Sequence, residues 1–271
     1  MKNLQYLKRR IKTSNSVSKI AKAIEMISVS KIHKSQEIVK RYGLYANKVK
    51  DIVYRVIFNR SLYNENCEYK RLVYIISPDR GLVGNLIMNL IKKVNSYLKS
   101  NDYVIIIGRK IMKDIIKYGH NVLMSFDMPT VLPKYTEIGT MINIANKFFI
   151  TKKVNKICMI YTKFINVFVQ KSVIEEIFSV KSSEFKSTVN YIFEPNFQFI
   201  LQNLLPFYLN VGFYNALVNA YTSEQAARMI AMKTAKDNAN DILIYLTNIY
   251  NKSRQEKITN EILDLVNGQE F

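Results

Sequence analysis

VNAYTSEQAARMIAMKTAKDNANDILIYLTNIYNK, residues 218–252, contains neither glycine nor proline, and apolar side chains recur in it at seven-residue intervals. The repeat continues on the N-terminal side and is interrupted only by Gln225; its members are Leu204, Val211, Val218, Met232, Ala239 and Leu246. A second row with the same period is mixed in polarity and consists of Tyr208, Asn215, Thr222, Met229, Lys236, Leu243 and Tyr250. A sustained seven-residue period is typical of a left-handed coiled coil. The polar members indicate a seam that is incompletely dry.

The predicted C-terminal helix extends from Phe197 to about Val266. At ~1.5 Å rise per residue, its length is on the order of 100 Å. A globular domain of this chain length cannot bury such a helix, so we expect it to project or to be covered by partner chains.

The N-terminal segment also lacks helix breakers. No proline precedes Pro78, and Gly43 is the only glycine before Ser77. Its apolar residues are mostly three or four positions apart and include Leu4, Leu7, Ile11, Val17, Ile20, Ile24 and Ile27. We therefore predict a coiled-coil helix over residues 1–60 and a second one within residues 197–271.

Residues 68–195 read as a central α/β domain, because short aliphatic runs alternate with amphipathic segments. The predicted strands are 72–76, 103–107, 156–164 and 167–174, and the predicted helices are 86–98, 111–118 and 135–149. The predicted fold class is thus α/β: a long two-helix coiled coil with a small, parallel-type, Rossmann-like domain.

A net charge of +19 distinguishes this 271-residue chain. Strongly basic proteins are attracted to nucleic acid, anionic membranes or acidic proteins. Basic residues cluster near the N-terminus with Tyr6 as the one nearby aromatic, so base stacking is poorly supported. A basic coiled-coil nucleic-acid binder remains the alternative function. The clustered residues are Lys8, Arg9, Arg10, Lys12, Lys19, Lys22, Lys31 and Lys34.

Signatures of catalysis are absent from the sequence. It has no P-loop, no GxGxxG pattern and no GxSxG elbow, and His33 and His120 lack ligand spacing. Cys67 and Cys158 stand alone and are expected to be ordinary thiols in a reducing compartment. We predict no catalytic, cofactor-binding or metal-binding residue, although a small α/β nucleotide enzyme remains a third hypothesis.

One turn could be interpreted in two ways. Asp79-Arg-Gly-Leu-Val-Gly84 follows a predicted strand and precedes a helix, where nucleotide folds bind phosphate. Arg80 with two glycines would suit an anion. The favoured interpretation is a tight turn that needs Gly81 for backbone freedom and Asp79 as a helix cap.

Four blocks along the chain resemble the gamma subunit of F-type ATP synthases, in the family's order. They are KIAKAIEMISVSK at 19–31, SPDRGLVG at 77–84, TSEQAARMIAMK at 222–233 and YNKSRQEKITNE at 250–261. Val83 and Asn85 depart from the family's cysteine and second glycine, and the C-terminal tail 267–271 departs from its small apolar end. The central domain matches only sparsely.

The resemblance implies that the terminal helices form an antiparallel coiled coil inside a hexamer of alternating alpha and beta subunits. The central domain would sit with an epsilon subunit on the membrane rotor ring. Rotation driven by ion flow would then drive ATP synthesis on the beta subunits, so this chain itself would be no enzyme and would need no cofactor. It would be a single-copy rotor, peripheral on the cytoplasmic face of a bacterial inner membrane. A mitochondrial location is less favoured, because the match begins within the first few residues and leaves no presequence.

Motif positions also imply contacts with the beta-subunit ring. On the C-terminal helix these are Arg254, Gln255, Thr259 and Glu261. In the N-terminal block, Met26, Lys22 and Lys31 are expected to face the same ring, with packing in the seam as the alternative for Met26.

Overall fold

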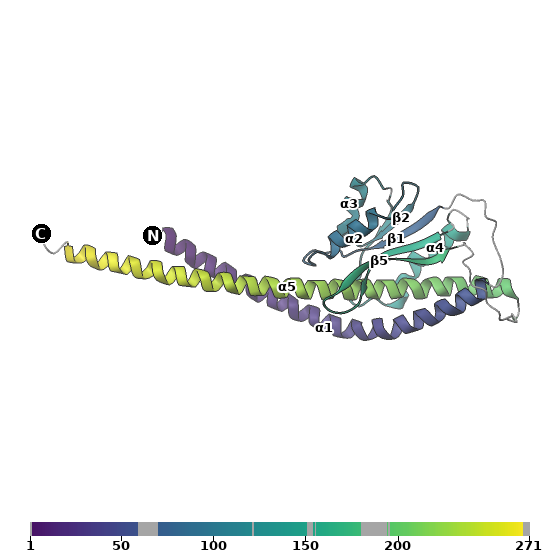
Figure 1. Ribbon diagram of the computed structural model, residues 1–271, viewed down its shortest axis with the longest axis horizontal. Helices are drawn as coiled ribbons and strands as arrows, with labels where there is room; N and C mark the ends of the chain where they lie inside the picture. Colours follow the sequence, from purple (N-terminus) through teal and green to yellow (C-terminus); the bar gives the residue numbers. More distant parts are fainter. Residues whose placement is uncertain are drawn as a thin grey trace. The chain divides into compact units, whose positions relative to one another are not determined.

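The computed structural model describes residues 2–58, 70–120, 122–150, 154, 156–179, 194 and 196–267. The chain divides into two compact units, which are Met1–Ser28 with Arg228–Phe271 (unit 1) and Val29–Ala227 (unit 2). Helix α1 (Lys2–Phe58) and helix α5 (Phe197–Asn267) each contribute to both units (Figure 1). The predicted pair of long terminal helices is confirmed.

The predicted seam of α5 is confirmed by its burial. Every member of the seven-residue row from Val211 to Leu246 is buried, including the interrupting Gln225, which is 4% exposed. The polar member therefore lies inside the packed seam. Buried polar positions of this kind restrict a coiled coil to one register at some cost in stability.

Apolar spacing does not identify the seam of α1. Val17, Ile20 and Ile27 are 47%, 60% and 56% exposed. A different row of α1 side chains, repeating every seven residues, lies on the buried face of this helix. Several of its members are small and polar, and small side chains let two helix backbones approach closely. Its buried members are Leu7, Ala21, Ser28, Ser35 and Val49, and its half-buried members are Ser14 and Tyr42.

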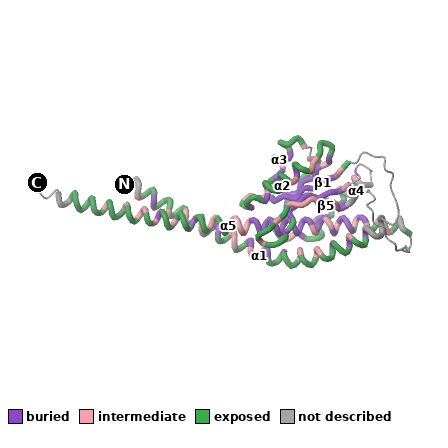
Figure 2. The backbone as a smooth tube through the Cα atoms, in the orientation of Figure 1, coloured by how far each residue is buried: buried purple, intermediate pink, exposed green. Residues whose placement is uncertain are grey.

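In unit 1 the two helices run antiparallel. The Ser14 hydroxyl donates to the Ala239 carbonyl oxygen at 2.9 Å, and Glu25 pairs with Lys236 at 2.9 Å. Higher numbers on α1 thus face lower numbers on α5, which confirms the predicted orientation. Past about residue 250, α5 extends beyond the start of α1 (Figure 1). Residues 251–264 are exposed there, apart from half-buried Ser253 and Lys257 (Figure 2).

Unit 2 contains a five-stranded sheet of order β3-β2-β1-β4-β5. Strands β1 to β4 are parallel and β5 is antiparallel to β4. The strands are β1 (Arg71–Ile76), β2 (Tyr103–Ile107), β3 (Val122–Phe126), β4 (Lys156–Phe164) and β5 (Gln170–Ser179). The shorter helices are α2 (Leu86–Asn95), η1 (Arg109–Ile111), α3 (Met112–Lys117), η2 (Tyr135–Ile138) and α4 (Gly139–Ile150).

The sheet is buried on both faces, as parallel sheets usually are. On one face Val73, Ile75 and Ile106 pack with residues of α2, η1 and α3. On the other face Tyr74 and Ile105 belong to a larger core with residues of α1, α4 and α5. The sheet thus packs against the parts of α1 and α5 that belong to unit 2.

Two details of the predicted sheet are wrong. Strand β3 was not predicted, because its Leu123 and Met124 are 41% and 46% exposed at the sheet edge and give no buried run. The last strand begins at Gln170 rather than Val167, because residues 165–169 form the hairpin turn.

Candidate partner interface

The turn after β1 does not form the anion site that was the less favoured interpretation of its sequence. The Asp79 carboxylate accepts hydrogen bonds from the backbone N–H of Arg109 at 2.8 Å and of Met128 at 3.0 Å. One of these amides begins η1 and the other follows β3. The Asp79 carboxylate thus occupies the backbone N–H groups that a bound phosphate would otherwise use. The Arg80 side chain is exposed, so its positive charge does not lie in a buried site.

The local roles predicted in this turn are also wrong. Asp79 does not cap α2, whose N-cap is Asn85 without a side-chain hydrogen bond. The left-handed conformations fall on Leu82 (φ 63°) and Gly84 (φ 56°) rather than on Gly81. The turn nevertheless remains a tight connection, and Val83 anchors it by packing with Leu86.

Histidine and cysteine form no reactive cluster in the described ranges. Among these residues, no three His, Cys, Asp or Glu side chains gather as metal ligands. Cys158 is buried with its Sγ 3.1 Å from the Tyr97 hydroxyl, and burial raises the pKa of the thiol. A buried thiol with a raised pKa is a poor nucleophile. Cys67 lies outside the described residues.

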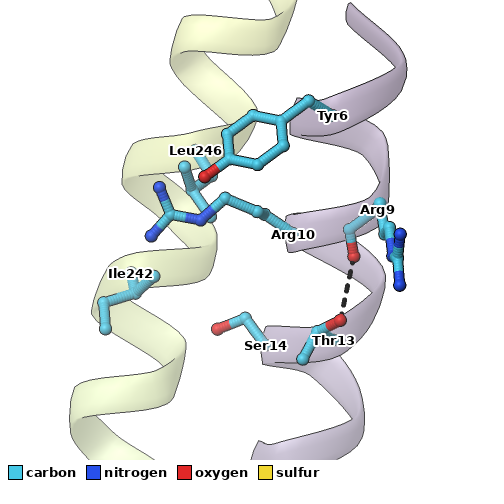
Figure 3. Close-up of a pocket in the computed structure, with 7 residues that line it drawn as sticks. All are labelled: Tyr6, Arg9, Arg10, Thr13, Ser14, Ile242 and Leu246. Carbon is cyan, nitrogen blue, oxygen red and sulfur yellow. Dashed lines mark hydrogen bonds between the residues drawn. The ribbon is translucent and has the colours of Figure 1, made fainter. Parts of the chain in front are cut away.

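Unit 1 has an open groove of about 320 Å³ between α1 and α5 (Figure 3). Arg10 lies 5.7 Å from the centre of the Tyr6 ring, and Ile242 and Leu246 contribute the apolar wall. The hydroxyl of Thr13 donates to the Arg9 carbonyl oxygen at 3.1 Å. The groove thus combines positively charged and apolar side chains. Its remaining lining residue is Ser14.

The predicted contacts on α5 lie in the exposed segment beyond residue 250. Arg254, Gln255, Thr259 and Glu261 are all exposed. At 100° per residue, Arg254 and Glu261 share one helix face with Ile258 between them. The structure therefore brings the four residues together on one exposed stretch of a single helix.

Intrahelical contacts already use part of this polar set. The Thr259 hydroxyl donates to the Gln255 carbonyl oxygen at 3.0 Å. The Glu261 carboxylate pairs with Lys257 at 3.1 Å, four residues earlier. Arg254 has no bonded partner among the described residues, so its guanidinium is fully available to another chain.

The three predicted contacts on α1 fall in different surroundings. Lys22 is exposed, and Met26 is 64% exposed, which excludes the alternative of seam packing for Met26. Lys31 lies in unit 2 and donates to the Thr130 carbonyl oxygen at 3.0 Å. Of the three, Lys31 is the residue whose side chain makes a hydrogen bond within this chain, among the residues that the structure describes.

Apolar residues of the exposed segment were missed from the sequence. Ile258 and Ile262 are 46% and 56% exposed. They lie four residues apart, so they are neighbours on one face of the helix. The sequence did contain a signal for them: two isoleucines four positions apart stand among the polar motif residues. They lie in the part of α5 that extends beyond the start of α1, so no described α1 residue covers them (Figure 1). The candidate interface is therefore mixed, with an apolar line between charged and amide groups.

None of the helices in the described ranges is both long and apolar enough to cross a membrane.

Comparisons with known proteins agree with the family that the sequence resembles. A family model described as ATP synthase matches residues 3–270. A protein named ATP synthase gamma chain from Dehalococcoides mccartyi is 31% identical over 280 residues, which covers 99% of this chain and 98% of the relative. The ATP synthase gamma chain of Legionella pneumophila is also 31% identical and is covered to 99%, as is this chain. No finding favours the nucleic-acid alternative.

Solved structures share the fold at lower identity. A chain of the Euglena gracilis mitochondrial ATP synthase OSCP/F1/c-ring structure has a TM-score of 0.72 at 16% identity, covering 98% of this chain and 93% of that chain. A chain of the Tetrahymena thermophila mitochondrial ATP synthase central stalk/c-ring structure has a TM-score of 0.63 at 21% identity, covering 80% and 99%. With the family model and the curated relatives spanning nearly the whole sequence, this chain belongs to the ATP synthase gamma chain family.

Proposed function

We propose that this chain is the central rotor of an F-type ATP synthase. The observation that carries the proposal is α5, an unbroken helix of 71 residues whose last described turns are exposed. An exposed helix with apolar Ile258 and Ile262 on its surface is unusual unless other chains enclose it. Membership of the gamma chain family supports alpha and beta subunits as those chains.

In this assignment the chain performs no chemistry of its own. ATP synthesis takes place on the beta subunits, and the terminal helices turn inside the alpha/beta hexamer. Residues 68–195 form the part that meets the epsilon subunit and the membrane rotor ring. The complex lies on the cytoplasmic face of a bacterial inner membrane, with one copy of this chain, and ion flow through the ring turns it.

The polar residues near the C-terminus supply the contacts with the beta-subunit ring. Arg254 is the strongest candidate, because its guanidinium is exposed and unpaired among the described residues, whereas Glu261 is partly neutralised by Lys257. Gln255, Thr259, Lys22 and Met26 add neutral, basic and apolar contacts. Exposed ion pairs contribute only ~0–1 kcal/mol each, which suits contacts that must break and re-form during rotation.

Affinity purification of the full chain from detergent-extracted membranes tests the function. We expect alpha and beta subunits and the ring to co-purify, with ATP hydrolysis by the complex and none by the isolated chain. Hydrolysis by the isolated chain would refute the non-catalytic role. Absence of a nucleotide-hydrolysing hexamer would refute the rotor assignment itself.

Arg254→Ala tests the contact residues within that complex. We expect ion-driven ATP synthesis to fall about two- to fivefold, as for loss of about 0.5–1 kcal/mol of interaction, with the complex still assembled. Lys113→Ala on α3 is the matched control, since Lys113 is also an exposed basic residue on a helix. Unchanged synthesis in the Arg254 variant would remove this residue from the interface.

A further inference from the structure

The β4–β5 hairpin of unit 2 ends in a turn that exposes three apolar side chains. Phe168 is 80% exposed, Ile165 is 55% exposed and Val169 is 48% exposed. Phe168 is the most exposed of the large hydrophobic residues in the described ranges. Apolar side chains gathered on one protruding element are typical of an interaction site.

Hydrogen bonds within the turn fix its backbone. The Asn166 side-chain oxygen accepts from the backbone N–H of Phe168 at 2.9 Å and of Val169 at 2.8 Å. The Gln170 side-chain amide donates to the Val167 carbonyl oxygen at 2.7 Å. A backbone fixed in this way has little conformational entropy left to lose when Phe168 binds a partner.

Two lysines lie directly behind the turn. Lys163 on β4 and Lys171 on β5 are directly opposite each other in the antiparallel register, and both are exposed. Ile165 and Val169, the turn residues next to the two strand ends, are exposed as well. Like charges in a cross-strand pair repel each other, and no acidic side chain among the described residues pairs with either lysine. The pair therefore favours a negatively charged neighbour from outside this chain.

The hairpin is fastened to α5 inside unit 2. The backbone N–H of Phe164 donates to the Asn219 side-chain oxygen at 3.4 Å, and the Ser223 hydroxyl donates to the Thr162 carbonyl oxygen at 2.9 Å. Asn219 and Ser223 are buried. The hairpin base is therefore anchored to α5 by buried hydrogen bonds.

We propose that this tip, consisting of Ile165, Phe168 and Val169 with Lys163 and Lys171 behind it, docks an acidic segment of another protein chain. Phe168 enters an apolar pocket of that segment while the two lysines pair with its carboxylates. One aromatic anchor surrounded by polar groups is the usual arrangement of an interface hot spot. The proposal rests on the proposed function in one respect, because it takes the partner from among the other subunits of the assembly.

An anionic membrane is the less favoured occupant. Sequence segments that bind acidic lipids typically contain about 4–8 clustered basic residues, whereas two lysines flank this turn. A single aromatic side chain adds too little buried area for stable attachment to a bilayer.

A photo-crosslinker at position 168 tests the docking surface in the purified complex. With benzoylphenylalanine in place of Phe168, we expect irradiation to join this chain to one other subunit, at a segment rich in Asp and Glu. A crosslink to a segment without acidic residues, or the absence of any crosslink to another chain, would overturn the proposal.

Charge reversal tests the lysines separately from the aromatic anchor. We expect Lys163→Glu with Lys171→Glu to lower the crosslink yield at least about threefold, because charged rims contribute to association. Lys113→Glu with Lys117→Glu on α3 places the same charge change elsewhere on unit 2 and should leave the yield unchanged. Equal losses in both double variants would overturn the pairing of the hairpin lysines with carboxylates.

Two further measurements distinguish a lipid partner from a protein partner, and failure of the docking surface from failure of the proposed function. The full chain is mixed with vesicles of phosphatidylcholine and phosphatidylserine, and sedimentation with them that depends on Lys163 and Lys171 would overturn the protein partner in favour of lipid. If the purified complex lacks alpha and beta subunits, the proposed function fails. A crosslink from position 168 to an acidic chain in that complex would still support the docking surface.

Discussion

Glu25 of α1 and Lys236 of α5 form an ion pair across the seam of unit 1, with 2.9 Å between Oε2 and Nζ. Both side chains are mostly enclosed, at 18% and 22% exposure. Asp237 adds a weaker contact at 3.8 Å from the same ammonium. The hydrogen bond from Lys236 to Glu25 raises the pKa of Lys236. This pair, with the serine contacts near it, sets which turn of α1 faces which turn of α5.

We predict that Glu25→Lys lowers the melting temperature of the full-length chain by several degrees, because two ammonium groups then meet in the seam. Combining it with Lys236→Glu should recover most of the loss. Circular dichroism melts of the single and double variants measure both effects. A double variant no more stable than Glu25→Lys would show that the pair does not interact.

The wild-type pair also gives a dependence on pH. Because the folded-state pKa of Lys236 is raised, its stabilisation is present below the unfolded value of about 10.4 and is lost as the pH rises through the folded-state pKa. The difference in stability between wild type and Lys236→Met should therefore shrink in strongly alkaline buffer. A constant difference from neutral to alkaline pH would contradict the assigned ion pair.

Arg71 and Asp102 form a second enclosed pair, at the start of β1 and before β2. Arg71 Nε lies 2.7 Å from Asp102 Oδ1, and its guanidinium lies 4.5 Å from the centre of the Tyr97 ring. Asp102 is 8% exposed. We predict that Arg71→Met costs about 3 kcal/mol, since it leaves a buried carboxylate unpaired.

Urea unfolding of three variants measures this cost. Arg71→Lys should recover only part of it, because an ammonium cannot reproduce the two parallel hydrogen bonds from Arg71 Nε and Nη2 to the Asp102 carboxylate. Arg71→Met combined with Asp102→Leu should be closer to wild type than Arg71→Met alone. Equal stability of Arg71→Lys and wild type would rule out a role for the bidentate geometry.

Gly108 ends β2 in a conformation that other residues rarely adopt, at φ 95°. A Cβ built there would lie 1.8 Å from the Ser77 carbonyl oxygen. We predict that Gly108→Ala destabilises unit 2 by about 3 kcal/mol, through both strain and displaced backbone.

Gly119 is the matched control for Gly108. It has φ 82°, but no atom beyond its chain neighbours lies within 4 Å of the position that a Cβ would take. Gly119→Ala therefore carries the conformational strain alone, at about 1 kcal/mol. Chemical denaturation compares the two variants. If both lose the same stability, the close approach to Ser77 contributes nothing.

Buried tyrosines predict loss of stability in alkaline solution. Burial raises the pKa of Tyr74, and burial together with Glu175 raises the pKa of Tyr161. An unfolded tyrosine ionises near pH 10, so above this value the unfolded state loses protons that the folded state retains. Stability then falls as the pH rises.

Tyr74→Phe isolates one of these groups. At neutral pH the variant loses the hydrogen bond from Tyr74 to the Met141 carbonyl oxygen, at a cost of about 1 kcal/mol. Above about pH 10 the wild type loses stability because Tyr74 ionises in the unfolded state, whereas phenylalanine at this position cannot ionise. The stability of the variant should therefore approach or exceed that of the wild type. Urea unfolding at neutral and alkaline pH measures the change. A fixed deficit at both values would contradict burial as the cause of the raised pKa.

The long helices and the central strands could be predicted because their signals are local. Scarcity of glycine and proline identified α5 to within one residue of its end, and aliphatic runs located β1, β2 and β4. The seam of α5 followed from its seven-residue row for the same reason. These features depend on the helix or strand propensity of the residues and on the spacing of apolar side chains. Both are determined by residues close together in the sequence.

Features that depend on distant residues could not be predicted. The seam of α1 uses Ser14, Ser28 and Ser35, whose polarity hides their role until α5 packs against them. Asp79 binds amides that are 30 and 49 positions away. The hairpin lysines become a pair only through the register of β4 with β5. In each case the deciding contact is set by the tertiary fold.

Ala231 tests whether α5 must be continuous, since it lies within unit 1 near the middle of the helix. Pro206 is tolerated in the same helix, but it lies within the first ten residues, counted from Phe197. We predict that Ala231→Pro costs about 3 kcal/mol or more and abolishes ion-driven ATP synthesis, because it removes a backbone hydrogen bond and kinks the helix. Ala231→Gly should cost only about 1 kcal/mol and leave the helix unkinked. ATP synthesis by inverted membrane vesicles compares the two variants with wild type. Wild-type synthesis in the proline variant would mean that torque does not pass through a continuous α5.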